Sequence, residues 1–193
     1  DFEKLAKYCI KDSLLALELL LKLNLLDKYI ALANVSGTLL QDILDSGETT
    51  KIENLLLREF DKKGFILPCR PDKSIVRNRM KQRKVGLTGG YVIEPEKGLH
   101  SNVIVLDFKS MYPSIIRSYN ICPTTLLKTG ETGDIKTPSG ASFVRPETRK
   151  GIIPEILENL MEERQKVKKV IKNAKKNGRK RALSAKEFAL KIM

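Results

Sequence analysis

Cysteine and histidine are scarce in this chain of 193 residues. The three cysteines, Cys9, Cys69 and Cys122, are odd in number and widely spaced, so they predict neither a disulfide framework nor a zinc site. This cysteine usage fits a reducing intracellular setting. We expect the single histidine, His100, to lie at the surface without a chemical role.

Long hydrophobic runs are absent as well. The most apolar stretch, residues 14–26, contains Glu18 and Lys22 and is too short to span a membrane, so it predicts a helix. We therefore expect no signal peptide and no membrane partner. The expected location is the cytoplasm, with association to the nucleoid if the source is a prokaryote.

Acidic residues are outnumbered, with 23 Asp and Glu against 36 Lys and Arg and a net charge of +13. This excess predicts a polyanionic partner. Residues 150–193 alone hold 13 basic and 5 acidic residues, a net charge of +8. Such a stretch is either a solvated face or an arm that contacts nucleic acid without sequence preference.

Residues 107–116 read Asp-Phe-Lys-Ser-Met-Tyr-Pro-Ser-Ile-Ile and follow an apolar run, residues 103–106, that is typical of a strand buried on both faces. Ser110 and Pro113 predict a helix start, with Ser110 as the N-cap. A strand that ends in Asp107 and leads into a helix N-terminus suits a metal-bound triphosphate. The alternative is that Asp107 only caps a turn.

This decapeptide resembles motif A of the family B DNA polymerases, Asp-x-x-Ser-Leu-Tyr-Pro-Ser-Ile-Ile, with Met111 in place of Leu. The resemblance implies that Asp107 is the catalytic acid and bridges two Mg²⁺ ions, with the carbonyl of Phe108 completing one metal shell. It also implies that the backbone N–H groups of Ser110, Met111 and Tyr112 meet the phosphates of a dNTP. Tyr112 would pack beneath the sugar and clash with a 2′-hydroxyl, which favours DNA synthesis.

Composition predicts a helix from residue 1 to about residue 26, on which Tyr8 and Asp12 share one face. By themselves these two residues read as a surface pair. Beside motif A they resemble the third exonuclease motif of proofreading family B enzymes. Because one acid cannot hold two metal ions, we predict no exonuclease activity from this chain.

The middle of the chain predicts helices and a small amount of strand. Amphipathic patterns over residues 27–65 predict a helical connector whose last helix ends at Gly64. The basic residues 73–84 either touch the template backbone or form a solvated helix. Residues 129–145 predict one or two short strands with a turn.

Gly89 and Gly90 resemble the Tyr-x-Gly-Gly segment of archaeal-type family B enzymes, although Leu87 replaces its tyrosine. Paired glycines let backbone approach closely, which implies DNA binding through a template phosphate. The alternative is a Gly-Gly turn that opens a strand at Tyr91.

The last segment predicts two helices, one from Gly151 to about Asn177 and one from about Ser184 to the end. Arg164 interrupts the apolar stripe of the first helix, and Lys168 follows one turn later. Two like charges at this spacing repel each other.

Two alternatives explain this pair of cations. A triphosphate neutralises both charges, or both side chains lie in solvent beside Glu162 and Glu163. The segment around Arg164 and Lys168 resembles the first fingers helix of family B polymerases, where such residues grip the incoming dNTP. Lys191 resembles the lysine that opens motif B and implies a third phosphate contact.

The predicted fold class is α+β, with a partial palm sheet, a long antiparallel helical fingers hairpin and N-terminal helices. The expected division is residues 1–26 for the end of an exonuclease-like domain and 27–71 for the connector. Residues 72–150 would form the first part of the palm, and residues 151–193 the fingers hairpin.

The resemblance implies one part of a DNA-directed DNA polymerase, a nucleotidyltransferase that uses a DNA primer-template, dNTP and Mg²⁺. We find no motif C and no thumb, and motif B is incomplete, so we expect the isolated chain to be inactive. A second polypeptide or a further C-terminal segment would supply these parts. The alternative is a basic, non-catalytic DNA-binding remnant of a polymerase.

Overall fold

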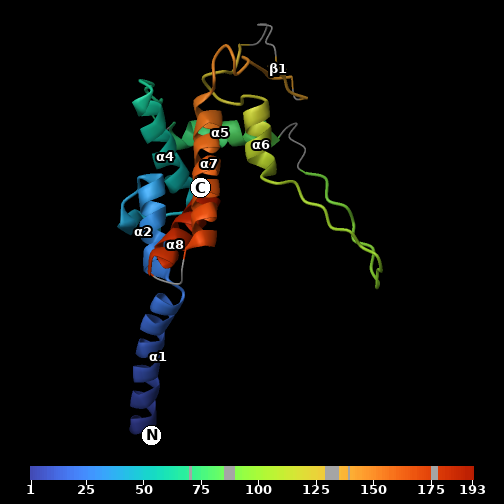
Figure 1. The fold of residues 1–193 in the computed structure, drawn as a ribbon. Coiled ribbons are helices and arrows are strands. Elements are labelled where there is room, and N and C mark those ends of the chain that lie inside the picture. Colours follow the sequence, from blue (N-terminus) through green and yellow to red (C-terminus); the bar gives the residue numbers. More distant parts are fainter. Residues whose placement is uncertain (70, 85–89, 129–134, 139, 175–177) are drawn as a thin grey trace. The chain divides into compact units, whose positions relative to one another are not determined.

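The computed structural model describes residues 1–69, 71–84, 90–128, 135–138, 140–174 and 178–193 (Figure 1). The chain divides into two units, one made of residues 1–65 with 110–193 and the other of residues 66–109. Most of the described chain is helical, with one small antiparallel sheet.

The helices are, in chain order, α1 (Phe2–Lys22), α2 (Leu25–Ser36), α3 (Leu40–Asp45), α4 (Glu48–Lys62), α5 (Lys73–Lys84), α6 (Met111–Ser118), α7 (Ile152–Asn173) and α8 (Gly178–Ile192). The strands are β1 (Ile135–Lys136) and β2 (Ser142–Phe143), paired so that Ile135 faces Phe143. The short strands predicted over residues 129–145 are therefore confirmed where this region is described. None of the helices among the described residues combines the length and the apolar character needed to cross a membrane.

The helix predicted over residues 1–26 is two helices. Asn24 adopts left-handed backbone angles, φ 54° and ψ 41°, which end one helix and start the next. The helices predicted over residues 27–65 are confirmed as α2, α3 and α4, and Gly64 follows α4 with φ 74° as expected. Their role as a connector stays a prediction. α1 contributes no buried residue.

The core of the larger unit lies where α8 packs against α2 and α7 (Figure 1). Leu32, Ile43 and Ala189 are buried together there. Phe188 packs on the same cluster and receives the Lys28 ammonium 5.1 Å from the centre of its ring. Burial of this cluster anchors α8 and thereby sets which of its residues face α7.

A buried asparagine joins the end of α6 to the start of α7. The Asn120 amide donates to the carbonyls of Val144 at 2.7 Å and Arg149 at 2.9 Å, and its oxygen accepts the Gly151 N–H at 2.8 Å. A Cβ at Gly151 would lie 2.7 Å from the Cβ of Cys122, so only glycine fits this close approach. We call residues 119–126 together with 142–151 the α6–α7 junction.

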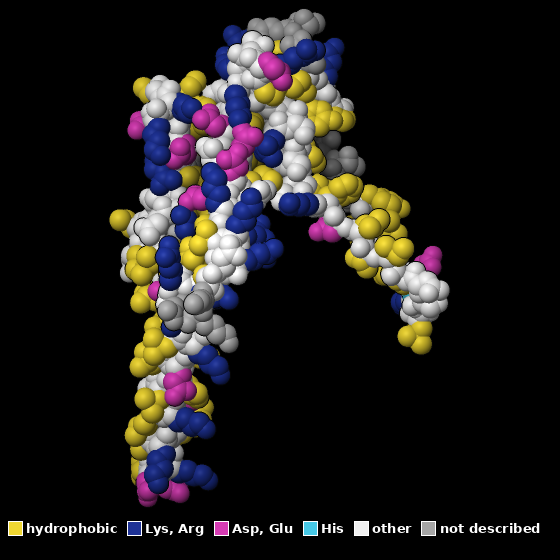
Figure 2. Space-filling view, in the orientation of Figure 1, with side chains coloured by type: hydrophobic (Ala, Val, Ile, Leu, Met, Phe, Trp, Pro, Cys, Tyr) yellow, Lys and Arg dark blue, Asp and Glu magenta, His cyan; other side chains and the backbone are white. Residues whose placement is uncertain are grey.

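The buried strand predicted over residues 103–106 is not found. These four residues are 65% to 89% exposed and, among the described residues, pair with no strand. A strand buried on both faces needs neighbours that accept its backbone hydrogen bonds and cover its side chains. The one described sheet, β1 with β2, provides neither, and hydrophobic side chains remain uncovered in this segment (Figure 2).

The two C-terminal helices form, but their bounds differ from the prediction. α7 ends at Asn173, four residues before the predicted end, and α8 begins at Gly178, six residues before the predicted start. The predicted turn residue Asn177 lies outside the described residues. The basic residues 73–84 form the helix α5, whose described side chains are exposed or half-buried, in line with the solvated-helix alternative.

Candidate functional site

The two predicted metal-binding residues lie in a segment without helix or strand. Asp107 and Phe108 are both exposed, Phe108 to 78%. They belong to the unit of residues 66–109, whereas Ser110 begins the return of the chain to the larger unit. The boundary between the two units therefore falls between Asp107 and the start of α6, although the two are close in sequence.

The predicted helix start is confirmed, with Ser110 as the N-cap of α6. Ser110 has left-handed angles, φ 52° and ψ 51°, and its side chain makes no capping hydrogen bond. The first helical bond runs from the Ser114 N–H to the Ser110 carbonyl at 2.9 Å. Among the described residues, no carbonyl accepts the N–H groups of Met111 and Tyr112, as is usual for the first turn of a helix. The Tyr112 side chain is 73% exposed.

Arg164 and Lys168 meet a carboxylate of α8. The Arg164 Nε donates to Glu187 Oε1 at 2.8 Å, and the Lys168 Nζ lies 3.7 Å from the same oxygen. The Arg164 side chain is only 27% exposed. The solvent alternative did not include Glu187 as the shared partner of these cations. Their contact with a triphosphate stays a prediction.

Glu187 brings a negative charge to the place where Arg164 and Lys168 meet. Partial burial raises the pKa of Glu187, but the hydrogen bond from Arg164 and the positive charges of Arg164 and Lys168 outweigh it and lower that pKa below its ordinary value. Lys191 lies one helical turn after Glu187, on the same face of α8. The structure thus gathers Arg164 and Lys168 around one acid that neighbours Lys191.

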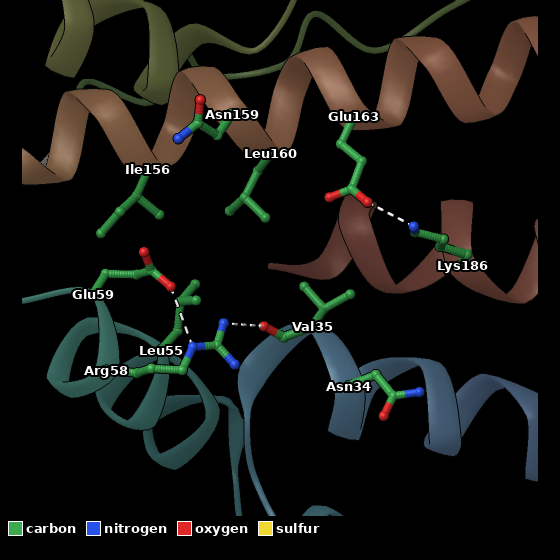
Figure 3. A pocket seen from close by; sticks show the side chains of 10 residues that line it. All are labelled: Asn34, Val35, Leu55, Arg58, Glu59, Ile156, Asn159, Leu160, Glu163 and Lys186. Carbon is green, nitrogen blue, oxygen red and sulfur yellow. Dashed lines mark hydrogen bonds and ion pairs between the residues drawn. The ribbon is translucent and has the colours of Figure 1, made fainter. Parts of the chain in front are cut away.

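A second ion pair lies beside the first and fastens the same two helices. Lys186 of α8 contacts Glu163 of α7 at 2.6 Å, on the edge of a cavity of about 360 Å³ between α2, α4, α7 and α8 (Figure 3). In that cavity Arg58 donates to the Val35 carbonyl at 3.0 Å and to Glu59 at 3.2 Å. None of the predicted site residues lines this cavity.

The remaining predicted residues lie apart from these groups. Tyr8 and Asp12 are exposed on one face of α1, as the spacing predicts, and their exonuclease-like role stays a prediction. Gly89 lies outside the described residues. Gly90 is exposed, and apart from its chain neighbours no described atom lies within 4 Å of a Cβ built there, so the described residues leave room for a side chain at this position.

The described residues do not by themselves fit a two-Mg²⁺ site. Among them, no three or more His, Cys, Asp or Glu side chains lie close enough together to hold a metal ion. Asp107 supplies one carboxylate and Phe108 one carbonyl, whereas a pair of divalent ions needs several acidic ligands. The Mg²⁺ ions and the two ligands stay predictions.

The sequence prediction missed Glu187. Its position four residues before Lys191, on a helix expected to pack against α7, was a usable signal, because an acid there shares a face with a predicted phosphate ligand. The contact between Arg164 and Glu187 cannot be predicted from helical periodicity, because the two residues are 23 positions apart and lie on different helices.

Comparison with known proteins identifies relatives along nearly the whole chain. The sequence profile of DNA polymerase family B matches residues 38–193. The DNA polymerase delta catalytic subunits of Bos taurus and Caenorhabditis elegans are 36% and 37% identical to this chain over 198 and 194 residues, respectively. These matches cover 98% of this chain, which spans 17% of the length of each subunit. A solved family B DNA polymerase from the archaeon Pyrobaculum calidifontis matches with a TM-score of 0.69 and 31% identity, over 89% of this chain and 22% of that one.

Proposed function

The chain belongs to DNA polymerase family B, and from this premise we propose that it forms part of a template-directed DNA polymerase. In the proposed reaction the 3′-hydroxyl of a DNA primer attacks the α-phosphate of a dNTP, and pyrophosphate leaves. Because the chain spans 17% of the length of its delta-type relatives, the rest of the active site would come from other parts of the polymerase.

The observation that carries this proposal is the gathering of cations between α7 and α8. Arg164 and Lys168 converge on one point, and Lys191 lies one turn from it. Arginine offers a planar fork for phosphate oxygens, and lysine adds a mobile point charge. We assign these three residues to the triphosphate of the incoming dNTP.

The motif A segment would hold the reacting end of the nucleotide. Free N–H groups at the start of α6, around Ser110, Met111 and Tyr112, suit phosphate oxygens. The exposed Tyr112 ring is available to stack beneath a deoxyribose. Asp107 and the Phe108 carbonyl would be two of the metal ligands. Bound Mg²⁺ would supply charge neutralisation at the phosphates.

We propose the following roles for the other segments. α7 and α8 form the antiparallel fingers hairpin, β1 and β2 belong to the first part of the palm, and α2 to α4 form the connector. Gly89 and Gly90 contact the template, and α1 carries Tyr8 and Asp12 as an exonuclease remnant. A polymerase part requires these segments together, whereas DNA binding alone requires no particular one of them.

Complementation tests the proposal. The chain is mixed with a polypeptide that carries the remaining fingers, palm and thumb of a related family B polymerase, and extension of a labelled primer is measured with dNTPs and MgCl₂. We expect extension in the mixture and a loss of at least about a hundredfold for Asp107→Ala. Asp61→Ala, an exposed acid of α4, is the matched control and should extend primers like the parent chain.

Extension that survives Asp107→Ala would disprove the catalytic assignment. Stable association without any extension would favour the alternative, a basic DNA-binding remnant. That alternative predicts DNA binding that falls steeply with salt and does not change when Asp107 is replaced.

A further inference from the structure

We infer that Glu187 is a built-in competitor of the nucleotide, a carboxylate that occupies Arg164 and Lys168 until a triphosphate displaces it. The inference rests on the proposed function, because it concerns the same phosphate-binding cations. It goes further by assigning a role to an acid outside the motifs named above. It also states that this acid weakens nucleotide binding.

The contact geometry favours exchange over a permanent lock. Glu187 accepts one hydrogen bond from Arg164 at 2.8 Å, while Lys168 at 3.7 Å lies beyond hydrogen-bond distance. The Lys168 side chain is 53% exposed, so an anion can reach this point from solvent. One carboxylate oxygen serves both cations, which leaves the group of three with a net positive charge.

A triphosphate can interact with these cations more strongly than Glu187 does. It carries several negative charges and many acceptor oxygens, so it can bond Arg164 and Lys168 at the same time. Binding must nevertheless break the pair between Arg164 and Glu187 and leave a carboxylate beside the incoming phosphates. Both effects weaken nucleotide binding, which gives Glu187 a direct influence on affinity.

A purely structural role for Glu187 makes the opposite prediction. If the pair only fastened α8 to α7, its loss would loosen the helices and weaken nucleotide binding. The neighbouring pair of Lys186 with Glu163 already links these helices, and Ala185, Ala189 and Leu190 bury α8 independently. Removing the Glu187 charge should therefore leave the packing intact.

Direct binding measurements separate the two roles. Calorimetric titration of the purified chain with dTTP, and separately with inorganic tripolyphosphate, is compared for the parent chain, Glu187→Gln, Glu163→Gln and Arg164→Ala. Glu163→Gln removes the same charge from the same interface but frees Lys186 instead of the phosphate cations, so it is the matched control. Thermal melting of each variant checks the fold.

We expect Glu187→Gln to bind both anions about threefold to tenfold more tightly, as the loss of a partly buried ion pair would allow. Glu163→Gln should stay within about twofold of the parent, which is near the limit for a rim charge. Arg164→Ala should bind more weakly than the parent. If Glu187→Gln lowers the melting temperature, Glu187→Ala repeats the test, because it also lacks the charge and places no amide in the interface.

The outcomes distinguish this inference from the proposed function. Equal or weaker binding by Glu187→Gln, or a gain matched by Glu163→Gln, overturns the competitor role while a weakened Arg164→Ala still supports the phosphate site. If Arg164→Ala binds both anions as the parent does, the phosphate site is wrong and the competitor role falls with it.

Discussion

The α6–α7 junction and the motif A segment differ in how chemical information and structure are distributed. The junction has no functional motif, yet its two buried polar residues, Asn120 and Thr125, are hydrogen-bonded. The motif A segment, meaning the apolar run 103–106 together with the decapeptide 107–116, contains the most recognisable residues of the chain. Its first six residues, 103–108, are nevertheless exposed and have no regular structure.

This difference shows that a recognisable motif and a locally determined structure are separate properties. Asn120 gains its position from three hydrogen bonds and a left-handed φ of 51° that asparagine tolerates. Asp107 gains its proposed function from its chemistry and its place beside α6.

Asn120→Ala should lower the free energy of unfolding by about 3 kcal/mol or more, because it leaves buried backbone groups at Val144, Arg149 and Gly151 without partners. Chemical denaturation followed by circular dichroism measures the loss. Asn120→Gly separates the lost hydrogen bonds from the left-handed φ, since glycine adopts that angle freely.

Asn159→Ala is the matched control for this prediction, because Asn159 is exposed on α7. Its expected change is within about 0.5 kcal/mol. If Asn120→Ala were equally mild, the junction would not be the rigid element described above.

Glu158→Gln should cost less than about 1 kcal/mol at neutral pH, because the ion pairs of Glu158 are half-exposed. The hydrogen bond from Lys150 and then that from Arg117 lower the pKa of Glu158 from its ordinary value of 4.5. A lowered folded-state pKa stabilises the fold above the ordinary value and loses that contribution as pH falls through the lowered one.

The measurement for Glu158 is the difference in unfolding free energy between parent and Glu158→Gln at a series of pH values. We expect this difference to be constant from neutral pH down to about 4.5 and to shrink below it. Glu162→Gln, whose Lys166 partner is 3.8 Å away, should show a smaller difference at every pH. A Glu158 difference that grew as the pH fell would contradict the pairing.

Val105→Ala should change the unfolding free energy by less than about 0.5 kcal/mol, because the Val105 side chain is 87% exposed in the motif A segment. The same substitution at Val167, which is buried in α7, is the matched comparison and should cost more than about 1 kcal/mol. A loss at Val105 as large as that at Val167 would show that this segment is buried after all.

Much of the helical fold could be predicted from the sequence, and the reason is local. Apolar spacing indicated the connector helices and both C-terminal helices, and Gly64 and Ser110 marked an end and a start correctly. Residues 103–106 misled the prediction because their composition is typical of a buried strand, whereas burial depends on neighbours that composition does not report.

The candidate site divides in the same way. Residue type and spacing predicted the family, which the comparisons confirm. They also indicated Asp107, Arg164, Lys168 and Lys191 as site residues, and those roles stay predictions. The packing of the helices, by contrast, was needed to show that Glu187 contacts two of those cations and that Asn120 fixes the start of α7. These contacts span 23 and 31 residues, and they form only because α8 packs on α7 and α7 begins beside the end of α6.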